Sequence, residues 1–102
     1  LRAKLNDCRW NARRRGLLFD LTIGDLQEVF DRQNWRCAYT GIALSARGER
    51  PSVDRIDNDV GYTLSNIQFV TANINRMKNT LSHAEFLALC NVVSEYRREN
   101  AK

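Results

Sequence analysis

The middle third of the chain constrains the fold most, because it holds only short β-prone pieces separated by residues that interrupt regular structure. The pieces cover residues 42–44, 52–57 and 67–70, and Gly41, Pro51 and Gly61 lie among them. Glycine and proline at such places favour turns over continuous secondary structure. The sequence therefore predicts a small β-hairpin in this stretch and no helix through it.

Two helices are expected before the hairpin. The first carries an apolar stripe at helical spacing, made of Leu1, Leu5, Cys8 and Ala12, and is expected to end at Gly16. The second is expected over about residues 23–33, with Thr22, followed by Asp25 three residues later, as its N-cap. Its residues expected to face the core are Leu26, Val29 and Phe30. These patterns predict a helical N-terminal part.

Two further helices are expected after the hairpin. The sequence predicts a short helix over residues 71–79, with the side chains of Ile74, Met77 and Leu81 facing the core. Ser82 and Glu85 form a capping box for a last helix. Its expected buried stripe consists of Phe86, Leu89, Cys90, Val93 and Tyr96. The fold class predicted is therefore α+β, with a hairpin-plus-helix core flanked by helices.

The chain of 102 residues is short enough for one domain over residues 1–102. We divide it into a basic helical part (1–36), a core (37–80) and a C-terminal helix (81–102). No apolar run approaches the roughly 18 residues of a membrane span, so we expect no membrane partner. Three cysteines, none in a C-x-x-C pair, indicate free thiols and a reducing compartment. Because the chain begins with Leu1 and not Met, we expect it to be a piece of a longer protein.

Positive charge is concentrated at the start of the chain. The net charge is +4, and residues 1–16 contain six Arg or Lys side chains against one Asp. Such a segment can bind nucleic acid, because each phosphate contact releases counterions. A membrane-surface segment and a solvated helix face have the same pattern. Charge alone leaves these alternatives open.

Residues 51–78 are rich in oxygen-bearing side chains, which hard cations prefer. An EF-hand loop does not fit, because Gly61 falls one place early and Gln68 stands where the closing Glu belongs. A zinc site does not fit either, because Thr40 replaces a second thiolate after Cys37.

The same block resembles the core of the HNH, or ββα-metal, nucleases, in the variant whose first motif reads Asp-Arg. Asp54 matches the metal-binding Asp, Asn66 the central Asn, and Asn75 the metal ligand on the helix, followed three residues later by Lys78. Residues 37–41 are similar to the family's C-x-x-C-G knuckle with its second cysteine lost. The resemblance spans residues 37–87, and the N-terminal part is similar to phage-type members.

The resemblance implies a Mg²⁺-dependent DNA endonuclease, with Mn²⁺ able to substitute and no structural zinc. Asp54 and Asn75 are then the metal ligands, and Asn66 braces the hairpin. The implied location is the cytoplasm of a bacterial or phage-infected cell. A non-catalytic DNA-binding module derived from such a nuclease is the alternative. A domain that cuts one strand would need a homodimer to break both.

The sequence departs from the family where the general base belongs, because Arg55 occupies that position. Arginine stays protonated, so we expect it to bind the scissile phosphate. The base is then Tyr39 or a metal-activated water, and we place His83 on the helix surface, away from the site. The side chains expected to bind DNA are Arg9, Arg13, Arg14, Arg15, Arg76 and Lys78.

Overall fold

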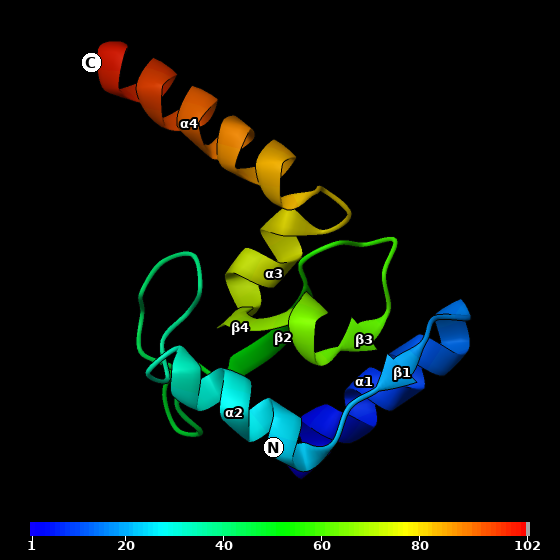
Figure 1. Ribbon diagram of the computed structural model, residues 1–102. Helices are drawn as coiled ribbons and strands as arrows, with labels where there is room; N and C mark the ends of the chain where they lie inside the picture. The colour runs from blue at the N-terminus through cyan, green and yellow to red at the C-terminus, as the bar shows by residue number, and fades with distance from the viewer. Residues whose placement is uncertain (102) are drawn as a thin grey trace.

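An antiparallel pair of strands, β2 (Pro51–Arg55) and β4 (Ile67–Thr71), lies at the centre of the computed structural model, which describes residues 1–101 (Figure 1). Asp54 is paired with Gln68 and Val53 with Phe69. Phe69 and Val70 are fully buried, so β4 lies within the hydrophobic core. The predicted hairpin is confirmed. The piece at 42–44 is not a strand: it contributes one isolated bridge between Ala43 and Arg36.

The two N-terminal helices form as their local signals predict. Helix α1 (Arg2–Arg15) ends at Gly16, whose φ of 67° is left-handed and suits glycine. Helix α2 (Ile23–Arg32) begins with the capping box of Thr22 and Asp25. The residues of these helices that are buried are Leu5, Cys8, Ala12, Leu26 and Val29. Both apolar stripes are confirmed.

A second small sheet was not predicted. Strand β1 (Phe19–Asp20) pairs in parallel with β3 (Tyr62–Thr63), and a single 3₁₀ turn, η1 (Leu64–Asn66), leads on to β4. Gly61 permits this pairing, because a Cβ there would lie 2.2 Å from the backbone oxygen of Leu18. The glycine is needed for close approach of two backbones.

Helix α3 (Ala72–Lys78) follows β4 directly and packs on both strands of the hairpin. The Thr71 hydroxyl accepts a hydrogen bond from the Ile74 amide and caps it. Ile74 packs against the core as expected. Met77 does not: it is 59% exposed, because a helix of two turns covers the hairpin with one face only.

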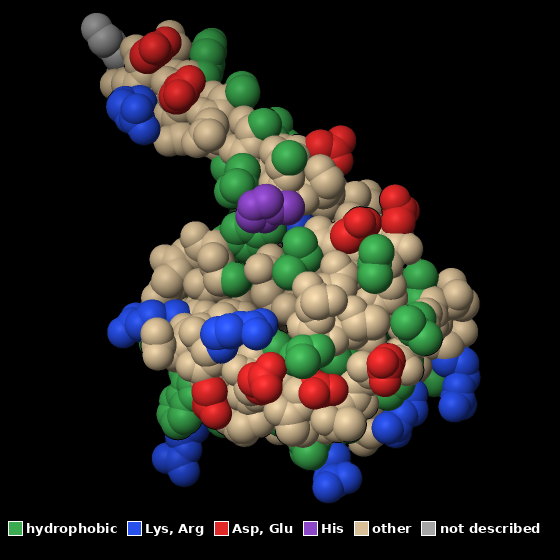
Figure 2. All heavy atoms as spheres, in the orientation of Figure 1, with side chains coloured by type: hydrophobic (Ala, Val, Ile, Leu, Met, Phe, Trp, Pro, Cys, Tyr) green, Lys and Arg blue, Asp and Glu red, His purple; other side chains and the backbone are tan. Residues whose placement is uncertain are grey.

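Helix α4 (His83–Glu99) begins with the predicted capping box of Ser82 and Glu85 but projects from the body of the molecule (Figure 1). Only Phe86 of the predicted stripe is buried; Leu89, Val93 and Tyr96 are more than half exposed, and Cys90 is half-buried. Hydrophobic side chains are visible along this arm (Figure 2). The prediction was wrong because, within residues 1–101, no element lies alongside the helix beyond its first turns. None of the described helices is long and apolar enough to cross a membrane.

Candidate active site

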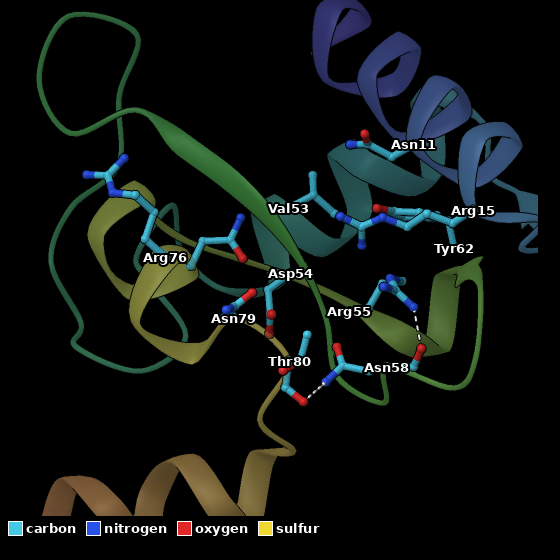
Figure 3. Close-up of a pocket in the computed structure, with 11 residues that line it drawn as sticks. Asn11, Arg15, Val53, Asp54, Arg55, Asn58, Tyr62, Arg76, Asn79 and Thr80 are labelled. Carbon is cyan, nitrogen blue, oxygen red and sulfur yellow. Dashed lines mark hydrogen bonds between the residues drawn. The ribbon is translucent and has the colours of Figure 1, made fainter.

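A polar pocket of about 460 Å³ lies along β2 (Figure 3). Its walls come from α1, β2, β3, α3 and the loops that follow β2 and α3. The lining residues are Asn11, Arg15, Val53, Asp54, Arg55, Asn58, Tyr62, Asn75, Arg76, Asn79 and Thr80. The C-terminal end of the basic helix α1 therefore lies beside the segment from β2 to α3, which contains the candidate metal ligands.

Asp54 is buried at the inner side of this pocket and holds two hydrogen-bond donors. Its Oδ1 lies 3.2 Å from Nζ of Lys78, and its Oδ2 accepts from Nε2 of Gln68 at 2.9 Å. Lys78 Nζ also donates to the backbone oxygen of Arg55. Asp54 is thus fixed from both strands and from α3.

The position of Lys78 contradicts the expectation that it binds a DNA phosphate. Its side chain has no solvent exposure, because the packing of α3 on β2 turns it toward Asp54. Within this arrangement the ammonium group orients a carboxylate and does not reach the protein surface.

Asn75 lines the same pocket as Asp54. Its Nδ2 donates to Oγ of Ser52 at 2.7 Å, which leaves the amide oxygen as an acceptor. Ser52 and Asp54 lie on the same face of β2, since strand residues alternate between faces. One pocket therefore contains both side chains that the resemblance implies to be metal ligands.

These two residues fit a hard divalent cation. A carboxylate offers about four lone pairs, so Asp54 can keep Lys78 and Gln68 and still present oxygen to an ion. Within residues 1–101 no group of three or more His, Cys, Asp or Glu side chains could hold a metal. An ion held by these two oxygens would keep coordination positions for water and phosphate, which is the arrangement that Mg²⁺ prefers.

Arg55 is held with part of its guanidinium free. Nη1 donates to the backbone oxygens of Asn58 and Val60 at 2.6 and 3.1 Å, and the group lies 5.4 Å from the ring centre of Tyr62 (Figure 3). The remaining donors of the guanidinium are available to a ligand in the pocket.

Arg15 and Arg76 are exposed and line the pocket from α1 and α3. The only carboxylate among the lining residues is that of Asp54, which Lys78 already pairs. Three guanidinium groups with one paired carboxylate make the pocket electropositive. Such a pocket attracts a phosphate group.

Asn66 does not line the pocket but fixes the loop that holds Arg55. Its Oδ1 accepts from the Asp57 amide, and its Nδ2 donates to the backbone oxygens of Asp57, Val60 and Gly61. The side chain is buried. Its contacts are those of a brace, the role that the resemblance implies.

Tyr39 and His83 form a pair that the sequence did not predict. The Tyr39 hydroxyl lies 2.7 Å from Nδ1 of His83, and the two rings stack with their centres 5.4 Å apart. Phe86 packs edge-on against Tyr39 at 5.1 Å. His83 is exposed, as expected, but the expectation that it lies apart from the candidate residues was wrong: the first turn of α4 folds back onto residue 39.

The surroundings of Tyr39 raise its pKa. Burial is the largest cause, and the charges of Asp54 and Cys37 act in the same direction, while the Gln68 side chain opposes them. The phenolate is therefore scarce near neutral pH.

Cys37 lies where the resemblance places the lost knuckle. Burial of its thiol acts to raise the pKa, but hydrogen bonds from the Thr40 side chain and from the backbone of Tyr39, Thr40 and Thr71 outweigh it and lower the pKa. Thr40 and Thr71 therefore both lie within hydrogen-bond distance of the Cys37 thiol.

The other arginines expected to bind DNA are exposed on α1. Arg9 lies over the ring of Phe19 at 5.1 Å, and Arg14 donates to Oδ1 of Asn11. Arg13, Arg14 and Arg15 form the last turn of the helix, where cations are favoured by the helix dipole. Of these arginines only Arg15 lines the pocket, together with Asn11; Arg9 and Arg13 lie on roughly the opposite side of the helix.

Among solved structures, the chain is similar to the rare-cutting HNH restriction endonuclease PacI, with a TM-score of 0.68 and 22% sequence identity over 97% of this chain and 80% of that one. The fold is therefore of the HNH nuclease type. No protein-family model matches the chain.

Two curated proteins, both uncharacterized, are similar in sequence. One from Acanthamoeba polyphaga mimivirus is 29% identical over 82 residues, and a 29.0 kDa protein of enterobacteria phage T4 is 28% identical over 89 residues. The matches cover 80% and 85% of this chain but only 14% and 35% of those proteins. The chain thus corresponds to one part of longer relatives.

Proposed function

We propose that this chain is a Mg²⁺-dependent endonuclease domain that hydrolyses phosphodiester bonds in DNA. One observation carries the proposal: a single pocket contains two oxygen ligands, Asp54 and Asn75, together with the guanidinium groups of Arg15, Arg55 and Arg76. The HNH-type fold supports the same reaction class.

Asp54 and Asn75 would hold the cation, for which Mn²⁺ can substitute. When bound, it supplies a Lewis acid that stabilises negative charge on the phosphate and on the leaving oxygen. Lys78 and Gln68 orient Asp54 for this purpose. Their hydrogen bonds fix both carboxylate oxygens, so the ligand is in place before substrate arrives.

Arg55 binds the scissile phosphate in this proposal. Its guanidinium is fixed through Nη1 by two loop carbonyls, and its other donors can form charge-assisted hydrogen bonds to phosphate oxygens. Such donors act most strongly where charge increases in the transition state. Asn66 contributes indirectly by bracing the loop that carries those carbonyls.

The rest of the DNA backbone is bound by Arg9, Arg13, Arg14 and Arg15 on α1 and by Arg76 on α3. These contacts give affinity without sequence preference. Similarity to a phage T4 protein supports action in a phage-infected bacterial cytoplasm. Cleavage of both strands would require two copies of the domain.

A DNA-binding module without catalysis is the second candidate, and the Asp54–Lys78 ion pair favours it. The pair already neutralises the only carboxylate of the pocket. If the ammonium group excludes a divalent cation, the chain binds DNA and does not cut it.

A plasmid-nicking assay decides between the two. Supercoiled DNA is incubated with the protein and Mg²⁺, Mn²⁺ or EDTA, and DNA affinity is measured in parallel. The endonuclease nicks with either metal and not with EDTA, and Asn75→Ala abolishes nicking while DNA affinity is retained. Met77→Ala, at an exposed position of the same helix, is the matched control and cuts normally. Binding without nicking under all three conditions identifies the non-catalytic module.

A further inference from the structure

A groove runs along α1 from the candidate active site to the start of the helix, and three pockets make it up. The active-site pocket and a smaller one of about 120 Å³ have these lining residues in common: Asn11, Val53, Tyr62 and Asn75. The smaller pocket shares Lys4 and Asp7 with a third, of about 640 Å³. The groove therefore joins the candidate metal ligands to a surface that the proposed function leaves unused.

The two walls of the groove are one stripe of α1 and the strand β2. The stripe consists of residues three or four positions apart, which lie on one face of a helix: Lys4, Asp7, Asn11 and Arg15. Residues 51–55 of β2 form the opposite wall, and Figure 3 shows Asn11 and Arg15 across from Val53. From position 4 to position 15 the helix rises about 16 Å. Stacked nucleotides of one strand lie about 3.4 Å apart, so the groove has the length of roughly five nucleotides.

An aromatic platform lies at the far end of the groove. Trp35, in the turn after α2, and Phe30 line the third pocket, and their rings stack with centres 5.7 Å apart and 13° between their planes. The indole Nε1 donates to Oδ1 of Asp31 at 2.8 Å, yet Trp35 is 56% exposed. Its φ of 58° is unusual for a bulky residue, and such backbone conformations cluster at functional sites. The fold therefore holds a large ring in a fixed orientation at the surface.

The groove is positively charged along its length. The cationic side chains that line its three pockets are Lys4, Arg15, Arg50, Arg55 and Arg76. Two carboxylates line it, those of Asp7 and Asp54, and the second is paired with Lys78. A cationic groove that leads to an exposed aromatic ring is the combination that binds a single nucleic-acid strand, because the charges follow the phosphates and the ring stacks on a base.

We propose that this groove binds one unpaired strand of DNA, with a nucleobase stacked on Trp35 and the flanking phosphates held by Lys4 and Arg50. This inference rests on the proposed endonuclease function and names its substrate class, DNA with an unpaired stretch beside the scissile phosphate. A base inside a duplex is covered on both faces by its neighbours and reaches an indole only by leaving the helix. An unpaired base has a free face.

The first test is DNA affinity, measured by fluorescence anisotropy in EDTA with three labelled ligands of about 12 nucleotides. They are a single strand, its duplex, and the same strand with its bases removed. Trp35→Ala should weaken binding of the intact single strand about 10-fold or more and leave duplex affinity unchanged. The strand without bases should bind the wild type and Trp35→Ala equally weakly. Trp35→Phe keeps an aromatic ring and should retain most of the affinity for the intact strand.

The matched control is Trp10, the other tryptophan of the chain. It is 61% exposed on α1 and lines none of the three pockets, so Trp10→Ala should leave single-strand affinity unchanged. Equal losses from Trp10→Ala and Trp35→Ala would show only a general contribution of exposed rings and would overturn the site.

Trp35 also reports on stacking directly. Trp10→Phe leaves it as the one indole of the chain, and its emission should be quenched by the intact single strand but not by the strand without bases. With Mg²⁺ present, Trp35→Ala should slow cleavage of the single strand at low DNA concentration by about the factor lost in affinity. Nicking of duplex plasmid should continue at the wild-type rate.

The outcomes separate this inference from the function on which it rests. If the wild type nicks plasmid but Trp35→Ala binds the single strand normally, the base site is wrong and the endonuclease stands. If the wild type cuts no DNA but binds the unpaired strand through Trp35, the endonuclease fails and the groove stands as a DNA-binding site. A strand without bases that binds as tightly as the intact strand overturns the stacking site in either case.

Discussion

Lys78 and Asp54, 24 positions apart, form an ion pair of 3.2 Å whose two side chains are 0% and 4% exposed. A charge in such a place is tolerated only while its partner is present. The pair therefore ties α3 to β2 at the point where the candidate metal ligands meet.

Removing one member of this pair should be strongly destabilising. Lys78→Met leaves the Asp54 carboxylate buried without its counter-charge, and we expect a loss of about 3–5 kcal/mol in the free energy of unfolding. Urea denaturation measures it. The double variant Lys78→Met with Asp54→Leu should recover much of the loss, since no unpaired charge remains. A single variant as stable as the wild type would contradict a buried pair.

The arginines at the end of α1 should supply DNA affinity that depends on salt. Replacing Arg13 and Arg14 by Gln should weaken binding to every sequence and reduce the salt slope by roughly 0.9 for each phosphate that is no longer neutralised. Fluorescence anisotropy at several salt concentrations gives both values. Arg97→Gln with Arg98→Gln removes the same charge from the far end of α4 and serves as control. Equal effects from the two pairs would show only a dependence on net charge.

Gly61 should tolerate no side chain. Gly61→Ala places a Cβ against the Leu18 backbone, and separating β1 from β3 to relieve the clash should cost about 1–3 kcal/mol. Gly24→Ala is the matched control: its Cβ would have ordinary contact at 3.6 Å, and alanine in a helix is favoured by about 0.5–1 kcal/mol. Thermal unfolding of the two variants should shift in opposite directions.

The two ends of α4 should differ in their effect on stability. Phe86→Ala removes a buried ring that packs on Tyr39 and should cost about 3–5 kcal/mol. Val93→Ala and Leu89→Ala change exposed side chains and should stay within about 0.5 kcal/mol of the wild type. Large losses at position 89 or 93 would mean that this face is covered in solution.

Local signals in the sequence were enough for most of the secondary structure. Gly16 ends α1, the caps at Thr22 and Ser82 begin α2 and α4, and glycine and proline between short β-prone pieces mark the hairpin. Each of these effects acts within a few residues, so each can be read from a short window. Asp54 and Asn75 were singled out by the resemblance to the HNH nucleases, and their assignment as metal ligands stays a prediction.

Contacts between residues far apart in the sequence could not be predicted from local patterns and became known only from the tertiary structure. His83 contacts Tyr39, 44 residues earlier in the chain, and Lys78 pairs with Asp54, 24 residues earlier. Strand β1 pairs with β3 although helix α2 lies between them in the sequence. An amphipathic stripe tells which face of a helix is apolar but not whether another element covers it, which is why α2 was predicted correctly and α4 was not. Local preferences set the elements of this chain, whereas the packing of side chains distant in sequence set the ion pair, the Tyr39–His83 contact and the free face of the last helix.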